Sequence, residues 1–109
     1  MTRIYNVYTL GDVDVRYSFH GLLFEWDRDK AATNLRKHGV SFETACEVFL
    51  DPLLLLRDAG DPDGMAQAVI GETLNERLLF VVHIIKSNEV IRMVSARSVT
   101  SHERRKYEE

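Results

Sequence analysis

The stretch FEWDRDKAATNLRKHGVSFETACEVFLDP, residues 24–52, decides the fold, because it reads as one strand followed by two helices. Asp27 is placed to cap a first helix that begins at Arg28, since its carboxylate can accept hydrogen bonds from backbone N–H groups of the first turn. Residues 36–38, Arg-Lys-His, put positive charge at the negative end of this helix. Gly39 follows, where a left-handed residue commonly ends a helix.

A second helix is predicted to begin after Ser41, which serves as its N-cap. Its apolar residues are spaced i, i+3, i+4 and i+7 and form one stripe: Phe42, Ala45, Cys46 and Phe49. Asp51-Pro52 ends the helix. Because Cys46 lies on the apolar stripe, we expect it to be a small buried hydrophobic residue and not a nucleophile.

The rest of the chain has mainly β character. Strands are predicted at residues 22–26, 53–57, 66–73, 78–86 and 90–96. The turns between the last three are too short for parallel crossovers, so these strands form an antiparallel meander. Thr100 and Glu103 make a capping box that begins a last helix. The sequence therefore predicts an α+β fold, with two N-terminal helices and a C-terminal helix packed on an antiparallel β-sheet.

Residues 1–22 are interpreted as an N-terminal extension to a single domain that spans residues 23–109. Within the extension, residues 4–10 and 13–19 read as strands, and Gly11-Asp12 suits the turn of a β-hairpin. A loosely ordered leader is the alternative.

The composition is that of an ordinary globular domain, with 45% hydrophobic and 28% charged residues. We expect a cytoplasmic protein, because there is no signal peptide and no apolar run long enough to span a bilayer. The net charge of −3 argues against a dedicated nucleic-acid-binding protein. Basic residues nevertheless cluster in residues 28–38 and 97–106, and these would form one local positive surface if they met in space.

The first helix carries the main candidates for chemistry. Its helical spacing predicts a buried stripe made of Ala31, Ala32 and Leu35. Along one edge of that stripe, where a cleft between helix and sheet is expected, lie Lys30, Asn34 and His38, with Lys37 just beyond. The alternatives are that the two lysines are solvated surface residues and that the histidine only complements the helix dipole.

Further candidates lie outside that helix. Arg97 follows the last strand, where a guanidinium can hold a phosphate through two parallel N–H···O bonds, or can instead pair with a carboxylate. Trp26 can stack on an RNA base or pack in the core. Glu103 is first a capping residue and second a candidate catalytic carboxylate. Arg104 and Tyr107 lie on one side of the last helix, and the tyrosine can simply pack that helix on the sheet.

The histidines and the one cysteine do not have the spacing of metal ligands, so the sequence predicts no metal site and no cofactor. There is no phosphate-binding glycine loop and no serine-nucleophile motif. His83 lies in the most apolar predicted strand, and we expect it to be a buried histidine with satisfied hydrogen bonds.

The motifs FEWDRDKAATNLRKHGVSF, FLDP and IRMVSARSVTSHERRKYEE resemble the BrnT family, which are toxins of bacterial and archaeal type II toxin–antitoxin pairs. The ordered set of E-W-D, K-H-G, D-P, S-A-R and E-R-x-x-Y is specific as a whole, and it covers the chain from Phe24 to the C-terminus, so 23–109 is the BrnT-like toxin domain. The resemblance implies a RelE-like ribonuclease that inhibits growth by cleaving RNA, with mRNA among the candidate substrates. It also implies a cognate, BrnA-like antitoxin that binds DNA and forms a higher-order complex with the toxin.

If the protein is a ribonuclease, the substrate's 2′-hydroxyl can attack the adjacent phosphate without a metal ion. The expected roles are proton transfer for His38 and phosphate stabilisation for Lys37 and Arg97. The expected RNA contacts are Trp26, Lys30, Asn34 and Arg104.

One departure from the family pattern concerns the strand that leads into Ile70-Gly71. Family sequences often carry an arginine at its start, and this chain has Met65-Ala66-Gln67 there. The alternative function is therefore a catalytically weak or inactive toxin-like domain that binds a DNA-binding antitoxin and modulates its repression. A stand-alone nucleic-acid-binding protein is disfavoured by the net charge.

Overall fold

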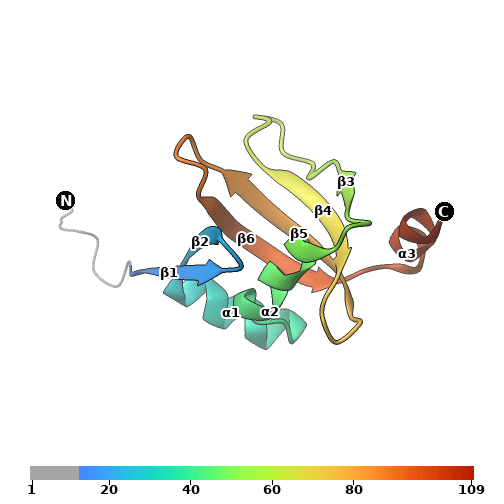
Figure 1. Ribbon diagram of the computed structural model, residues 1–109, viewed down its shortest axis with the longest axis horizontal. Coiled ribbons are helices and arrows are strands. Elements are labelled where there is room, and N and C mark those ends of the chain that lie inside the picture. The colour runs from blue at the N-terminus through green and yellow to red at the C-terminus, as the bar shows by residue number, and fades with distance from the viewer. Residues whose placement is uncertain (1–12) are drawn as a thin grey trace.

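A computed structural model of the protein describes residues 13–109 (Figure 1). The predicted strand at residues 4–10 and its turn at Gly11-Asp12 lie outside the described residues. In chain order the elements are β1 (Asp14–Phe19), β2 (Leu22–Asp27), α1 (Arg28–His38), α2 (Phe42–Cys46), the 3₁₀-helix η1 (Glu47–Leu50), β3 (Leu55–Arg57), β4 (Gln67–Glu72), β5 (Leu78–Ile85), β6 (Ile91–Ser98) and α3 (Ser101–Glu108).

The six strands form one sheet in the order β1-β2-β6-β5-β4-β3 (Figure 1). The predicted antiparallel meander of β4, β5 and β6 is confirmed. The prediction of a wholly antiparallel sheet is wrong, because β2 and β6 are parallel. The reason is topological: the chain leaves β2 through two helices and three strands before β6 returns beside it in the same direction. β1, in the region interpreted as an extension, pairs with β2 at the edge of this same sheet.

The helix ends form where the sequence places them. The Asp27 carboxylate accepts a hydrogen bond from Lys30 N at 2.9 Å. Gly39 ends α1 with a φ of 69°, a left-handed conformation that residues with a side chain rarely adopt. Its N–H donates to Leu35 O. Ser41 Oγ accepts from Thr44 N at 3.1 Å. The second helix is α-helical only as far as Cys46 and then tightens into η1.

The hydrophobic core lies between one face of the sheet and the elements α1, α2 and η1. Its buried side chains are Phe24, Trp26, Val40, Phe42, Ala45, Cys46, Val48, Val69, Leu79, Val81, Ile91, Met93 and Ala96. η1 approaches β4 so closely that a Cβ on Gly71 would lie 2.8 Å from Val48 Cβ, which explains the glycine at this strand position. Among the described residues, no helix is long and apolar enough to cross a membrane.

The opposite face of the sheet, which we call the open face, is not covered by α1, α2 or η1. On β5 the residues Phe80, Val82 and Ile84 of this face are half-buried and Leu78 is buried, whereas the alternate residues Leu79, Val81 and His83 are buried against the core. Figure 1 shows α3 at one end of the sheet, away from α1 and α2.

The predicted buried stripe on α1 is wrong. Asn34 is the buried residue of this helix, Ala31 is half-buried, Ala32 is exposed and Leu35 is 50% exposed. The helix is therefore turned so that its polar edge, and not its aliphatic one, faces β6.

Candidate active site

The candidate site forms where the edge of β6 has no strand beside it. β2 pairs with β6 only as far as Arg92, and α1 lies along the next part of β6. Asn34 supplies the missing hydrogen bonds: Nδ2 donates to Ala96 O at 2.9 Å, and Oδ1 accepts from Ala96 N at 3.1 Å. Nδ2 also donates to Val40 O at 3.0 Å. The Asn34 amide thus holds α1 to the sheet, and its predicted contact with RNA stays a prediction.

Between α1 and β6 lies a cleft of about 320 Å³, which we call the α1–β6 cleft. Its lining residues are Asp27, Asp29, Lys30, Thr33, Asn34, Lys37, His38, Val94 and Ser95. The structure therefore brings together the predicted edge of the first helix, including Lys30, Lys37 and His38, and places it in a cleft beside the sheet.

The chemistry of this cleft comes from its cations and its histidine. Lys30 and Lys37 are opposed by two carboxylates, of which Asp27 is already used as a helix cap. His38 ends α1 and is exposed. An imidazole is the side chain suited to exchange protons near neutral pH, and ammonium groups stabilise charge on a phosphate.

Arg97 does not line the cleft. Its guanidinium donates to the Glu103 carboxylate through two bonds of 2.8 and 2.9 Å, and it lies over the Phe80 ring at 4.3 Å from the centroid. The Arg97 hydrogen bond is the main reason that the pKa of Glu103 is lowered. The sequence left open an ion pair as the alternative to phosphate binding, and the structure contains that ion pair.

Two other predicted RNA contacts also lie away from the cleft. Trp26 is 2% exposed and packs on Tyr17 and Phe42, with ring centroids 5.6 and 5.7 Å away, so it is a core residue, which is the alternative to base stacking that the sequence left open. Arg104 is exposed on α3, 3.9 Å from Glu108.

The last helix is fixed by polar contacts. Glu103 completes the predicted capping box with Thr100, and none of the α3 residues is buried. The Tyr107 hydroxyl donates to Asp51 at 2.5 Å, and this contact, with burial as the larger cause, raises the pKa of the tyrosine to about 12. Tyr107 therefore anchors α3 to the body of the protein.

Sequence reasoning missed Glu25. This carboxylate is 1% exposed and lies within 2.7 Å of Arg92, 2.9 Å of Lys86 and 3.4 Å of Arg16. The period of two in F-E-W gave a signal, because Phe24 and Trp26 face the core and the residue between them must face the other side of the sheet.

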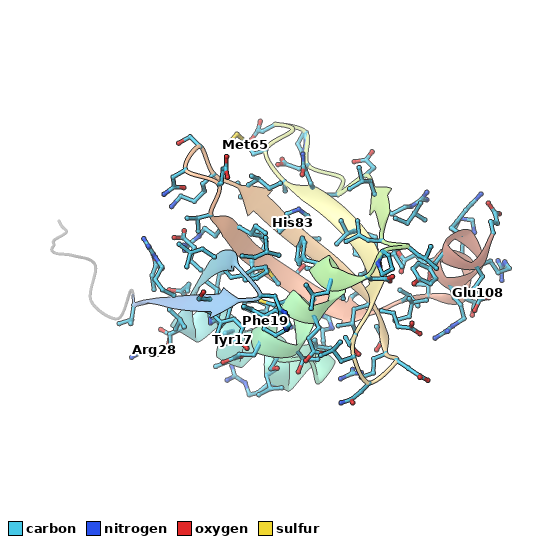
Figure 2. The ribbon with its side chains drawn as sticks, in the orientation of Figure 1. Tyr17, Phe19, Arg28, Met65, His83 and Glu108 are labelled. Atoms are coloured by element: carbon cyan, nitrogen blue, oxygen red, sulfur yellow. The ribbon has the colours of Figure 1, made fainter. Side chains whose placement is uncertain are left out.

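His83 is buried as expected, but its Nδ1 has no hydrogen-bond partner within residues 13–109. Figure 2 shows it near the middle of the sheet, and its ring meets Phe49 edge-on at 5.0 Å. Cys46 is fully buried as predicted, and burial raises the pKa of its thiol. In the described part of the chain, no group of three His, Cys, Asp or Glu side chains is arranged to hold a metal ion.

Comparison with known proteins identifies the family. Residues 26–103 match the family model described as the ribonuclease toxin BrnT of type II toxin–antitoxin systems. The fold is similar to that in the 1.1 Å crystal structure of the Brucella abortus ribonuclease toxin BrnT, with a TM-score of 0.58 and 26% identity over 70% of this chain and 94% of that chain. Among curated proteins, none matches the sequence.

The match places the protein in the class of ribonuclease toxins of type II toxin–antitoxin systems. Within that class the chain belongs to the BrnT family. β1 lies before the matched residues, so it is an addition to the part of the fold that the family model describes.

Proposed function

We propose that this toxin cleaves RNA in the α1–β6 cleft, through attack of the substrate's own 2′-hydroxyl on the adjacent phosphate. The observation that carries the proposal is that Lys30, Lys37 and His38 all line one cleft.

In the proposed reaction the 2′ oxygen forms a bond to phosphorus and the bond to the 5′ oxygen breaks. His38 accepts the 2′-hydroxyl proton, and the leaving 5′ oxygen takes up a proton from water. Lys37 stabilises the charge that develops on the phosphorane, and Lys30 contacts the RNA backbone. The products are a 2′,3′-cyclic phosphate and a 5′-hydroxyl. We assign Arg97 to anchoring α3 through Glu103, and not to the reacting phosphate.

The alternative function, a toxin-like domain that only binds an antitoxin, was suggested by the missing arginine near Ala66. Met65 lies on a loop at the end of the sheet away from α1 (Figure 2), and residues 65–67 do not line the α1–β6 cleft. The departure thus leaves the proposed catalytic groups in place, which favours the ribonuclease. We further propose that the protein acts in the cytoplasm and is restrained by a BrnA-like, DNA-binding antitoxin in a higher-order complex.

Growth arrest on induced expression tests the proposal. We expect the wild-type protein to stop growth, and His38→Ala and Lys37→Ala to relieve the arrest at equal protein levels. Arg36→Ala is the matched control, because this exposed cation belongs to the same turn and does not line the cleft. A wild-type protein that is folded and causes no arrest would point instead to the antitoxin-binding module.

A further inference from the structure

We propose that the ion cluster built on Glu25 is a second phosphate-binding site, which holds the RNA backbone next to the α1–β6 cleft. The inference rests on the proposed ribonuclease function and adds a binding site to it. The cluster consists of Glu25, Asp14 and three cations, Arg16, Lys86 and Arg92.

The cluster lies on the open face of the sheet. Glu25 is opposite Arg16 on β1 and beside Arg92 on β6, and its neighbours Phe24 and Trp26 face the core instead. The helices that form the core lie on the other face, yet the carboxylate is only 1% exposed. The long side chains of the three cations must therefore provide much of its cover, and they form the outer surface at this point.

The cluster carries more positive charge than its carboxylates neutralise. Glu25 stays ionised because its pKa is lowered, chiefly by the hydrogen bond from Lys86. Asp14 is paired with Arg92, whose terminal nitrogens lie 3.2 and 3.3 Å from its two oxygens. Three cations against two carboxylates leave one surplus positive charge on a protein whose net charge is −3.

Two of the cations keep donors free for a ligand. The Lys86 ammonium uses one of its three N–H groups on Glu25, and its side chain is 43% exposed. Arg16 approaches Glu25 through Nε, its side chain is 61% exposed, and its two terminal nitrogens have no partner within residues 13–109. A guanidinium and an ammonium held by one buried carboxylate are suited to bind a phosphate oxygen.

The position of the cluster decides which phosphate it binds. Asp27 lines the cleft and follows Glu25 by two residues on β2, and Val94 follows Arg92 by two residues on β6. Two residues of a strand span about 7 Å. One nucleotide of extended RNA can bridge this distance, so a strand with its scissile phosphate in the cleft passes a neighbouring phosphate over Arg16 and Lys86.

The test uses the double variant Arg16→Gln/Lys86→Gln, which keeps the Glu25–Arg92 pair. The matched control is Arg57→Gln/Arg105→Gln, which removes two exposed cations outside both sites. Cleavage of a single-stranded RNA of ten nucleotides is measured over a range of salt concentrations, with folding checked by thermal unfolding. We expect the double variant to raise KM about 10-fold with kcat retained, and to reduce the slope of log KM against log salt by about 0.7 for one lost phosphate contact. The control variant should have the KM and the salt slope of the wild type.

Equal KM values and equal salt slopes for the double variant and the wild type would overturn the proposal. If the wild type cleaves no RNA, the proposed function fails, and fluorescence anisotropy with the same RNA still tests the cluster through the same comparison of slopes. Titration with inorganic phosphate separates the two possible ligands. Phosphate binding that depends on Arg16 and Lys86, without any change in the RNA slope, would assign the site to free phosphate and overturn the assignment to RNA.

Discussion

At the scale of single residues, Asn34 makes the hydrogen bonds to the backbone of β6 that a neighbouring strand would otherwise make. Its amide bonds both backbone groups of Ala96 and the carbonyl of Val40, at the boundary between α1 and the sheet. The same contact turns α1 so that Lys30 and His38 face β6. A structural residue in the middle of the helix thereby sets the orientation of the proposed catalytic groups.

Replacement of Asn34 by alanine should leave three buried backbone groups without a partner. Each such group costs about 1–3 kcal/mol, so we expect the free energy of unfolding to fall by about 3 kcal/mol or more in urea denaturation. Thr33→Ala, at an exposed neighbouring position of the cleft, is the control and should change it by less than about 1 kcal/mol. A loss for Asn34→Ala no larger than for the control would show that the amide does not hold α1 to the sheet.

His83 makes stability depend on pH. Burial lowers its pKa, so the folded protein keeps the imidazole neutral while the unfolded chain takes up a proton near its ordinary pKa of about 6.5. The contribution of neutral His83 to the free energy of unfolding is therefore complete above about pH 6.5, and it is lost as the pH falls from there toward the lowered pKa. Urea denaturation between pH 7.5 and 5 should record this decline in the wild type and a flatter profile in His83→Leu. His102→Gln, which removes an exposed histidine, should keep the wild-type decline.

At the scale of elements, α3 differs from the other helices because it contributes no buried residue. It is held at the end of the sheet by the Arg97–Glu103 ion pair and the Tyr107–Asp51 hydrogen bond. Glu103 also completes the capping box, so one carboxylate serves both the start of the helix and its attachment.

Replacement of Glu103 by alanine should release α3 without unfolding the sheet. A lost cap and a partly exposed ion pair together cost about 1–2 kcal/mol, which corresponds to roughly a 10-fold faster amide exchange. Hydrogen exchange should rise over residues 101–108 and stay at wild-type values in β4, β5 and β6. His102→Ala on the same turn is the control. Unchanged exchange in α3 would mean that the apolar contacts of the helix hold it without Glu103.

At the scale of the whole molecule, local features were predictable and long-range ones were not. The caps at Asp27, Ser41 and Thr100 depend on neighbours three residues away, and the meander follows from its short turns. The parallel pairing of β2 with β6 joins residues more than sixty positions apart, and no local period encodes it. The burial of Asn34 depends on Ala96, which is equally distant, so helical spacing alone favoured the alanines of α1 instead.

In the candidate site too, residues close in the sequence could be predicted to lie together, and residues distant in the sequence could not. Lys30, Lys37 and His38 come from one helix, and helical spacing was enough to place them together. Arg97 does not line the cleft, because its guanidinium is paired with the carboxylate of Glu103, six positions later in the chain. The Glu25 cluster draws on β1, β2 and β6 and the end of β5, so only the folded sheet brings its charges together.

The most direct test of the account is the chemistry of the RNA ends that the purified protein produces. Mass spectrometry of a single-stranded RNA cleaved in the presence of EDTA should find a 2′,3′-cyclic phosphate and a 5′-hydroxyl. His38→Ala should slow the reaction by about 100-fold or more, because a positioned acid or base contributes about 10²–10⁴-fold. A 5′-phosphate product, or a His38→Ala variant that cleaves at the wild-type rate, would contradict the proposed reaction in the α1–β6 cleft.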